Sequence, residues 1–198
     1  MERKIKKEGQ LYIITDNVEV AEKALSSGAD IIQLRDKKSS DRILFEKACI
    51  FKELSEKFNA IFIVNDRVDI ALASNSDGVH LGQDDLPVDI VRKILGENKI
   101  IGLSTHSEKE IINAKGIDYI AVGPIFKSLT KPELSPKGIK LIEKAKKLAK
   151  VTFFAIGGIN LDNISYVIKA GARNVVISSG ILNNIEEKVK KIKEILST

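Results

Sequence analysis

Residues 61–87 read "IFIVNDRVDIALASNSDGVHLGQDDLP" and join two short apolar runs through a helix-like segment. Polar and acidic residues follow each run at once: Asn65 and Asp66 after the first, Asp84 and Asp85 after the second. Short, continuously apolar runs are typical of strands that are covered on both faces of a parallel sheet. The stretch is therefore predicted to be one β-α-β unit with carboxylates at the ends of two neighbouring strands.

The same alternation continues outward from this stretch over almost the whole chain. Segments with β-rich apolar runs are predicted to be strands at 11–16, 29–35, 60–65, 78–82, 99–105, 119–125, 151–158 and 174–180. Amphipathic segments are predicted to be helices at 18–27, 40–57, 68–75, 88–95, 107–115, 137–149, 161–170 and 185–196. Ser107 and Asn160 stand where N-caps are expected, and glycines such as Gly28 and Gly171 follow helices, as C-terminal signals do.

Eight β-α units without a linker favour a single-domain (β/α)8 TIM barrel that spans residues 1–198, in the α/β class. The competing fold is an open, doubly wound sheet of the flavodoxin or Rossmann type. That fold is disfavoured because no GxGxxG motif follows the first predicted strand.

The composition is that of a soluble globular protein, with 43% hydrophobic and 30% charged residues. No apolar run approaches the roughly 20 residues of a membrane helix, and the apolar part of the N-terminal region is too short for a signal peptide, so a cytoplasmic location is expected. The net charge of +5 comes from lysines spread over helix-like segments, which argues against nucleic acid and suits small anionic ligands. The single cysteine, Cys49, is predicted to be buried.

Polar side chains follow nearly every predicted strand, at the end where barrels carry their chemistry. Asp66 and Asp85 end neighbouring strands, so their carboxylates are predicted to meet at a hard cation such as Mg2+, which proteins hold with one or two carboxylates and substrate phosphates. Arg35, Lys37 and Lys131 supply cations for a phosphorylated ligand. A second anion site is predicted after the last two strands, at Gly157-Gly158 and Ser178-Ser179.

Each of these positions also has a purely structural interpretation. Asp66 and Asp85 can be N-caps of the helices that follow them, and Arg35 can form an ion pair at the barrel rim. Taken alone, His80 and His106 are better explained as structural histidines than as ligands. The coincidence of polar residues at eight strand ends favours the functional interpretation.

Read together, "LYIITD", "IIQLRDK", "VNDRVDIALASNSDGVHLGQDDLP", "IIGLSTHS", "DYIAVGPIFKSLTKP", "FFAIGGI" and "ISSGI" resemble the thiamine-phosphate synthase family, whose barrel fold is shared by thiazole tautomerases. The resemblance covers residues from about 11 to 181, in order. It implies a transferase that joins 4-amino-2-methyl-5-hydroxymethylpyrimidine diphosphate to thiazole phosphate with release of pyrophosphate.

The resemblance also implies a role for each matching residue. Those expected to bind the pyrimidine diphosphate are Gln33, Arg35, Lys37, Asn65 and Lys131, with Ser104 on the pyrimidine. Those expected to bind the thiazole phosphate are Ser128, Thr130, Gly158, Ser178 and Ser179. Asp66 and Asp85 are expected to hold Mg2+, and the preference for Asp85 over Asp84 rests on the resemblance alone.

The implied mechanism is dissociative: the bond to pyrophosphate breaks first, and the thiazole nitrogen captures the resulting pyrimidinylmethyl cation. Arg35, Lys37 and Lys131 are then the catalytic residues, because they stabilise charge on the leaving group. Two other functions stay open, a metal-independent thiazole tautomerase that depends on His106 and a noncatalytic binder of thiamine precursors. Tautomerases tend to lose the second carboxylate, which this chain keeps as Asp85. The sequence leaves open whether the chain forms a homo-oligomer.

Overall fold

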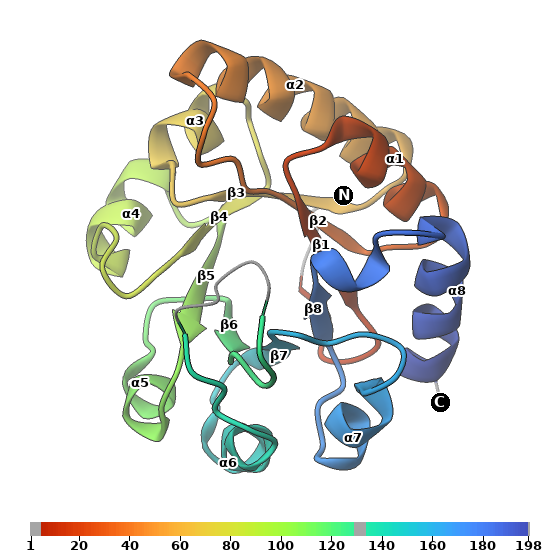
Figure 1. Cartoon of the computed structure of the whole chain (residues 1–198). Helices are drawn as coiled ribbons and strands as arrows, with labels where there is room; N and C mark the ends of the chain where they lie inside the picture. Colours follow the sequence, from red (N-terminus) through yellow and green to blue (C-terminus); the bar gives the residue numbers. More distant parts are fainter. Residues whose placement is uncertain (1–4, 129–133, 198) are drawn as a thin grey trace.

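The computed structural model describes residues 5–128 and 134–197, and its strands form a closed barrel inside a ring of helices (Figure 1). Each strand pairs in parallel with the next one, and the ring closes where Leu11, Tyr12 and Ile13 pair with Val175, Val176 and Ile177. The predicted (β/α)8 barrel is thus confirmed. An open, doubly wound sheet would instead have two edge strands that each pair on one side only.

The elements alternate in the predicted order. The strands are β1 (Leu11–Thr15), β2 (Ile31–Leu34), β3 (Ile61–Asn65), β4 (Gly78–Leu81), β5 (Ile100–Thr105), β6 (Tyr119–Val122), β7 (Thr152–Ile156) and β8 (Val175–Ile177). The α-helices are α1 (Val18–Ser26), α2 (Asp41–Lys57), α3 (Val68–Ala73), α4 (Val88–Leu95), α5 (Glu108–Asn113), α6 (Lys140–Leu148), α7 (Ile164–Lys169) and α8 (Ile185–Leu196). A short 3-10 helix, η1 (Ser179–Ile181), follows β8.

Local chemistry sets the ends of these elements. Strand β6 stops three residues before the predicted end, because Pro124 has no N–H for the ladder. Ser107 caps α5, since its hydroxyl oxygen accepts the Glu110 N–H at 3.3 Å. Asn160 instead caps the turn before α7, where its side-chain oxygen accepts the Asp162 N–H, and the helix begins at Ile164.

The barrel interior holds a small core of its own, separate from the larger core between strands and helices. Its centre is an aromatic cluster in which the rings of Tyr12, Tyr119 and Phe154 meet edge to face, with centroids 5.3–5.9 Å apart. Gly102 makes room for this cluster, because a Cβ there would lie 2.1 Å from the Tyr119 ring.

Carboxylates close the opposite end of the barrel in a repeated pattern. An aspartate stands directly before each of β2, β4 and β6, and its side chain accepts a backbone N–H from the preceding strand and binds a cation from a helix. The pairs are Asp30 with Leu11, Asp77 with Phe62 and Asp118 with Ile101, at 2.8 Å each, and the cations are Lys193, Lys52 and Arg92. Before β8 the residue is Asn174, which accepts the Gln10 N–H across the ring closure at 3.0 Å. We call these four contacts the strand clamps.

The prediction for Cys49 is wrong, because this side chain on α2 is partly exposed. The helix buries Leu44, Ala48 and Phe51, so its buried stripe passes through Ala48, and the next residue is turned about 100° away from it. Among the described residues, no helix is both long and apolar enough to cross a membrane.

Candidate active site

Two adjoining cavities open at the C-terminal ends of the strands, and together they gather every predicted site residue that the structure describes. We call the first the inner pocket; the predicted residues that line it are Gln33, Arg35, Asn65, Ser104, Ser128, Gly158, Ser178 and Ser179. We call the second the outer recess; the predicted residues that line it are Arg35, Lys37, Asn65, Asp66, Asp85 and Ser104. Arg35, Asn65 and Ser104 belong to both cavities, so a ligand in one lies beside a ligand in the other.

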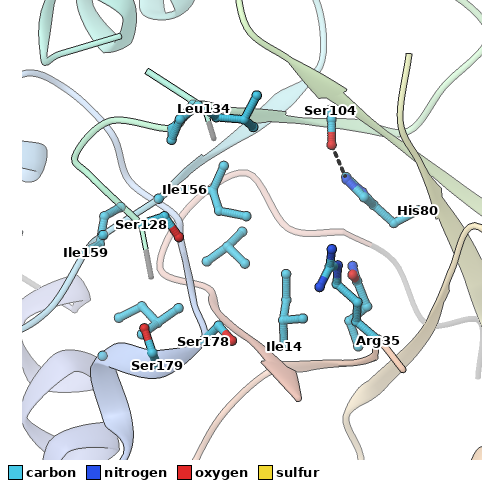
Figure 2. Close-up of a pocket in the computed structure, with 18 of the residues that line it drawn as sticks. Ile14, Arg35, His80, Ser104, Ser128, Leu134, Ile156, Ile159, Ser178 and Ser179 are labelled. Carbon is cyan, nitrogen blue, oxygen red and sulfur yellow. Dashed lines mark hydrogen bonds between the residues drawn. The ribbon is translucent and has the colours of Figure 1, made fainter. Parts of the chain in front are cut away.

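The inner pocket is apolar at its centre and polar on two opposite sides. Figure 2 shows Ile14 and Ile156 between two polar groups, with Arg35, His80 and Ser104 on one side and Ser128, Ser178 and Ser179 on the other. Its empty space, with the open mouth included, is about 820 Å³, which suits small-molecule ligands. A flat apolar ring with polar groups at both ends fits this lining.

Asp66 has an unusual backbone at the end of β3. Its φ is +60°, in the left-handed region that costs a residue with a Cβ about 1–2 kcal/mol. Its N–H extends the ladder by donating to the His80 carbonyl at 2.9 Å, and its carboxylate accepts the Lys37 ammonium at 2.5 Å. Strained backbone of this kind concentrates at functional sites. The N-cap interpretation of Asp66 is wrong, since α3 begins after Arg67 and has no side-chain cap.

Asp85 lies in the loop after β4 and meets Asp66 across the outer recess. One of its oxygens accepts the Gly82 N–H at 2.6 Å, which turns the carboxylate back toward the strand end. Burial, and then the neighbouring Asp66 carboxylate, raise the pKa of the Asp85 carboxyl above its ordinary value. Asp85 is not an N-cap, because Pro87 holds that position of α4. Asp84, by contrast, is exposed.

The two carboxylates fit a hard divalent cation. Among the residues that the structure describes, no group of three or more His, Cys, Asp or Glu side chains is arranged to hold a metal ion. A pair of carboxylates beside an anion-binding recess is the donor set that Mg2+ uses when substrate phosphates and waters complete its shell. A cation between the two carboxylates would also offset the repulsion between their like charges.

Lys37 is held in place by a residue that the sequence did not single out. The loop after β2 folds around the Asp36 carboxylate, whose Oδ1 accepts the N–H groups of both Lys38 and Ser39, at 2.9 and 3.0 Å. The Lys47 ammonium, from α2, reaches the same carboxylate at 2.6 Å. This loop fixes the segment that carries Lys37 over the recess. The signal for it was an aspartate two residues before a lysine-serine pair, which is typical of an Asx turn.

Glycines bring the β6–α6 loop against the end of β7. Gly158 has a φ of +65°, and a Cβ there would lie 2.4 Å from the Lys127 carbonyl oxygen. Gly157 has a φ of +103°, and a Cβ there would lie 2.5 Å from the Pro124 Cα. Only glycine allows this approach, which sets Ser128 on the same side of the pocket as Ser178 and Ser179 (Figure 2). Thr130 and Lys131, which were predicted to bind ligand, lie outside the described residues.

A buried chain of side chains, also missed from the sequence, crosses the barrel beneath the pocket. Gln33 Nε2 donates to the Tyr12 hydroxyl at 2.5 Å, and that hydroxyl lies 2.9 Å from the hydroxyl of Tyr119. His80 Nδ1 lies 3.0 Å from the Tyr119 hydroxyl, and its Nε2 lies 2.9 Å from Ser104 Oγ (Figure 2). Burial raises the pKa values of both tyrosines, so both phenols are neutral.

His106 makes a different contact. Its Nδ1 lies 2.6 Å from the Gly123 carbonyl oxygen and donates to it, since a carbonyl can only accept. Its N–H is bound by Glu110 of α5 at 2.8 Å. The residue lines both cavities but is anchored to backbone rather than to another predicted site residue.

Sequence comparison decides between the families that share this barrel. A family model described as "Thiamine monophosphate synthase" matches residues 9–181. The chain belongs to the thiamine-phosphate synthase family. Members of this family are transferases of thiamine biosynthesis, so the resemblance seen in the motifs is confirmed.

Relatives in the thiamine-phosphate synthase family agree along the chain. It is 40% identical over 198 residues to a thiamine-phosphate synthase from Persephonella marina, with 94% of this chain and 95% of the relative covered. It is 44% identical to one from Prochlorococcus marinus, of which it spans only about half, 54%. A thiamine phosphate pyrophosphorylase from Pyrococcus furiosus has a similar solved structure, with a TM-score of 0.89, 33% identity and 96% of each chain covered.

Proposed function

We propose that this protein is a thiamine-phosphate synthase that joins 4-amino-2-methyl-5-hydroxymethylpyrimidine diphosphate to thiazole phosphate and releases pyrophosphate. Family membership supports the reaction class. The observation that carries the proposal is the outer recess, where Asp66 and Asp85 lie together with Lys37. The recess adjoins the inner pocket, which is lined on its far side by glycine and serine residues. The reaction needs two such anion sites, one for each phosphorylated substrate.

The outer recess suits the diphosphate. Arg35 presents a planar fork and Lys37 a point charge, and both can bind phosphate oxygens; Asn65 adds an amide. Mg2+ bound by Asp66 and Asp85 would neutralise charge on the pyrophosphate and so improve it as a leaving group. Lys37 already binds Asp66 at 2.5 Å, so it can exchange this partner for the diphosphate.

The inner pocket suits the thiazole phosphate. Its apolar walls, including Ile14 and Ile156, pack against a flat ring and keep water from the reacting carbon. Ser128 and Ser178, on the far side of the pocket (Figure 2), would hold the phosphate. The Gly158 N–H, which also lines the pocket, would add a donor. Thr130 and Lys131 would join the phosphate sites, on the resemblance alone.

The bond changes balance without a protein nucleophile. The C–O bond between the pyrimidine methylene and the diphosphate breaks, and its electron pair leaves with pyrophosphate. The lone pair of the thiazole nitrogen then forms the new C–N bond, and no proton has to move. Arg35 and Lys37 act on the leaving charge, and the pocket holds the nitrogen in line.

The direct test mixes the purified protein with both substrates and Mg2+ and measures thiamine phosphate. Product is expected, EDTA should abolish its formation, and Asp66→Asn or Asp85→Asn should lower kcat/KM by at least about 100-fold. Asp84→Asn is the matched control, because it removes the same charge from the exposed neighbour and should keep most of the activity. Folded protein that yields no product would overturn the proposal.

The two alternatives predict other results in the same preparation. A thiazole tautomerase would aromatise the carboxylated thiazole phosphate in the presence of EDTA and lose this activity in His106→Ala. A noncatalytic binder would take up the pyrimidine diphosphate in calorimetry and never turn it over. The retention of Asp85 opposite Asp66 favours the synthase over the tautomerase.

A further inference from the structure

The buried series of hydrogen-bonded side chains from Gln33 to Ser104 begins at an acceptor that has no partner among the described residues. Gln33 is 1% exposed, and its Oε1 is a buried side-chain atom without a hydrogen-bond partner among the described residues. A buried acceptor that stays unpaired is destabilising. Because Gln33 lines the inner pocket, the missing partner is expected to be a donor on the ligand.

The hydrogens along the chain can be assigned from this end. Gln33 donates to the Tyr12 oxygen, so the single hydrogen of Tyr12 passes to Tyr119. The hydrogen of Tyr119 then goes to His80 Nδ1. A neutral imidazole that accepts at Nδ1 carries its hydrogen on Nε2, which donates to the Ser104 oxygen.

The other end of the chain is therefore also fixed. Since Ser104 accepts from His80, its own hydrogen is left to donate, and Ser104 lines the inner pocket (Figure 2). The chain thus presents an acceptor at Gln33 and a donor at Ser104. Turning the Gln33 amide over would require every hydrogen in the chain to reverse, because each phenol has only one.

This polarity matches one kind of pyrimidine. An aminopyrimidine carries an amino donor next to a ring-nitrogen acceptor, whereas the corresponding oxopyrimidine carries an oxygen acceptor next to an N–H donor. We propose that Tyr12, Tyr119 and His80 are positioning residues that fix the hydrogen-bond polarity of Gln33 and Ser104, so that the pocket selects the amino over the oxo pyrimidine. The proposal rests on the proposed function, which supplies the aminopyrimidine diphosphate as substrate.

The geometry favours a positioning role over simple packing. The ring of Tyr119 already fills the space beside Gly102 and meets Tyr12 and Phe154 edge to face, and a phenylalanine would do the same. The hydroxyl adds nothing to that packing. It does join the two halves of the chain, since it is the partner of both Tyr12 and His80.

The test compares kcat/KM for the amino diphosphate with kcat/KM for its 4-oxo analogue. The wild type should strongly prefer the amino compound, and Tyr119→Phe should lower this preference about tenfold or more, because the amide and the serine can then turn independently. Tyr12→Phe should act in the same direction. Tyr166→Phe is the matched control, since Tyr166 is 56% exposed on α7 and should keep the wild-type preference.

Nuclear magnetic resonance of the imidazole nitrogens gives a second readout that needs no variant. The protein has two histidines, and their contacts predict opposite tautomers. His80 is expected to carry its hydrogen on Nε2, and His106 on Nδ1, which donates to Gly123. In Tyr119→Phe the His80 tautomer should become mixed, while that of His106 should not change.

Two results would overturn the inference: an Nδ1–H tautomer at His80 in the wild type, or an unchanged preference in both Tyr→Phe variants of an enzyme that makes thiamine phosphate. The second result leaves the proposed function standing. A wild type that makes no thiamine phosphate would instead remove the proposed function, so the two failures are distinguishable.

Discussion

Replacing Gly158 by alanine tests the phosphate end of the inner pocket. The new Cβ would lie 2.4 Å from the Lys127 carbonyl oxygen and 2.8 Å from the Phe126 Cβ. To reach ordinary van der Waals contact, the Lys127 carbonyl must retreat by about 1 Å. Ser128 is the next residue, so the hydroxyl predicted to hold the thiazole phosphate moves with it.

The size of the effect follows from that displacement. A misplacement of about 1 Å can cost about 100-fold in rate when binding groups must align two reactants. We therefore expect kcat/KM for thiazole phosphate to fall about 100-fold in Gly158→Ala. The KM for the pyrimidine diphosphate should stay near its wild-type value, because Asp66 and Asp85 lie in the other cavity.

Gly96→Ala separates the clash from backbone strain. Gly96 ends α4 with a φ of +78°, and a Cβ there meets nothing within 4 Å. Both variants should lose about 1–3 kcal/mol of unfolding free energy because each puts a Cβ on a backbone with positive φ, but only Gly158→Ala should lose activity. Steady-state kinetics measures the activity, and urea unfolding measures the stability. Equal activities in the two variants would refute the assignment of the loop to phosphate binding.

Three further predictions concern the clamps, the β2 loop and the metal pair. Asp77→Ala should lower the unfolding free energy in urea by about 2–3 kcal/mol because it leaves the Phe62 N–H unpaired, and Asp77→Asn, which keeps an acceptor, should lose less; unchanged stability in both would refute the clamp. Lys47 holds the pKa of the Asp36 carboxyl well below its usual range, so its stabilisation is full above about pH 4 and is lost as the pH falls further. The stability difference between wild type and Asp36→Asn should therefore shrink in acid denaturation, and a difference that grows would contradict the sign. Mg2+ with pyrophosphate at about 100 times its dissociation constant should add about 2.7 kcal/mol to the unfolding free energy of the wild type, and a calorimetric scan of Asp85→Asn that shows the same gain would argue against the metal pair.

Local patterns were enough to predict the architecture. The apolar runs located all eight strands, because a strand covered on both faces leaves a continuous hydrophobic signature. Ser107 and Gly28 marked helix ends correctly, since caps depend on nearby residues alone. The prediction that Cys49 is buried was wrong, because burial on α2 changes from one residue to the next around the helix.

The sequence predicted which described residues would gather at this rim, but not the contacts between them. Strand ends showed that Asp66 and Asp85 would reach one rim, and the pattern could not tell a metal carboxylate from an N-cap. The structure excludes the N-cap for Asp66, because α3 begins after Arg67, and the metal role stays a proposal. The chain from Gln33 to Ser104 joins five strands, so it exists only once the barrel closes and sets their registers.

The strand clamps divide the barrel into pairs. Asp30, Asp77 and Asp118 each bind an N–H of the strand just before their own, so β1–β2, β3–β4 and β5–β6 are each tied within one stretch of chain. Only Asn174 reaches across the ring, to Gln10. A circular permutation that opens the chain before β3 would keep each aspartate close along the chain to the N–H that it binds, whereas one that opens between β3 and β4 would place Asp77 and Phe62 near opposite ends. The natural modules of this ring, in rearrangement or in recombination, are therefore two strands long.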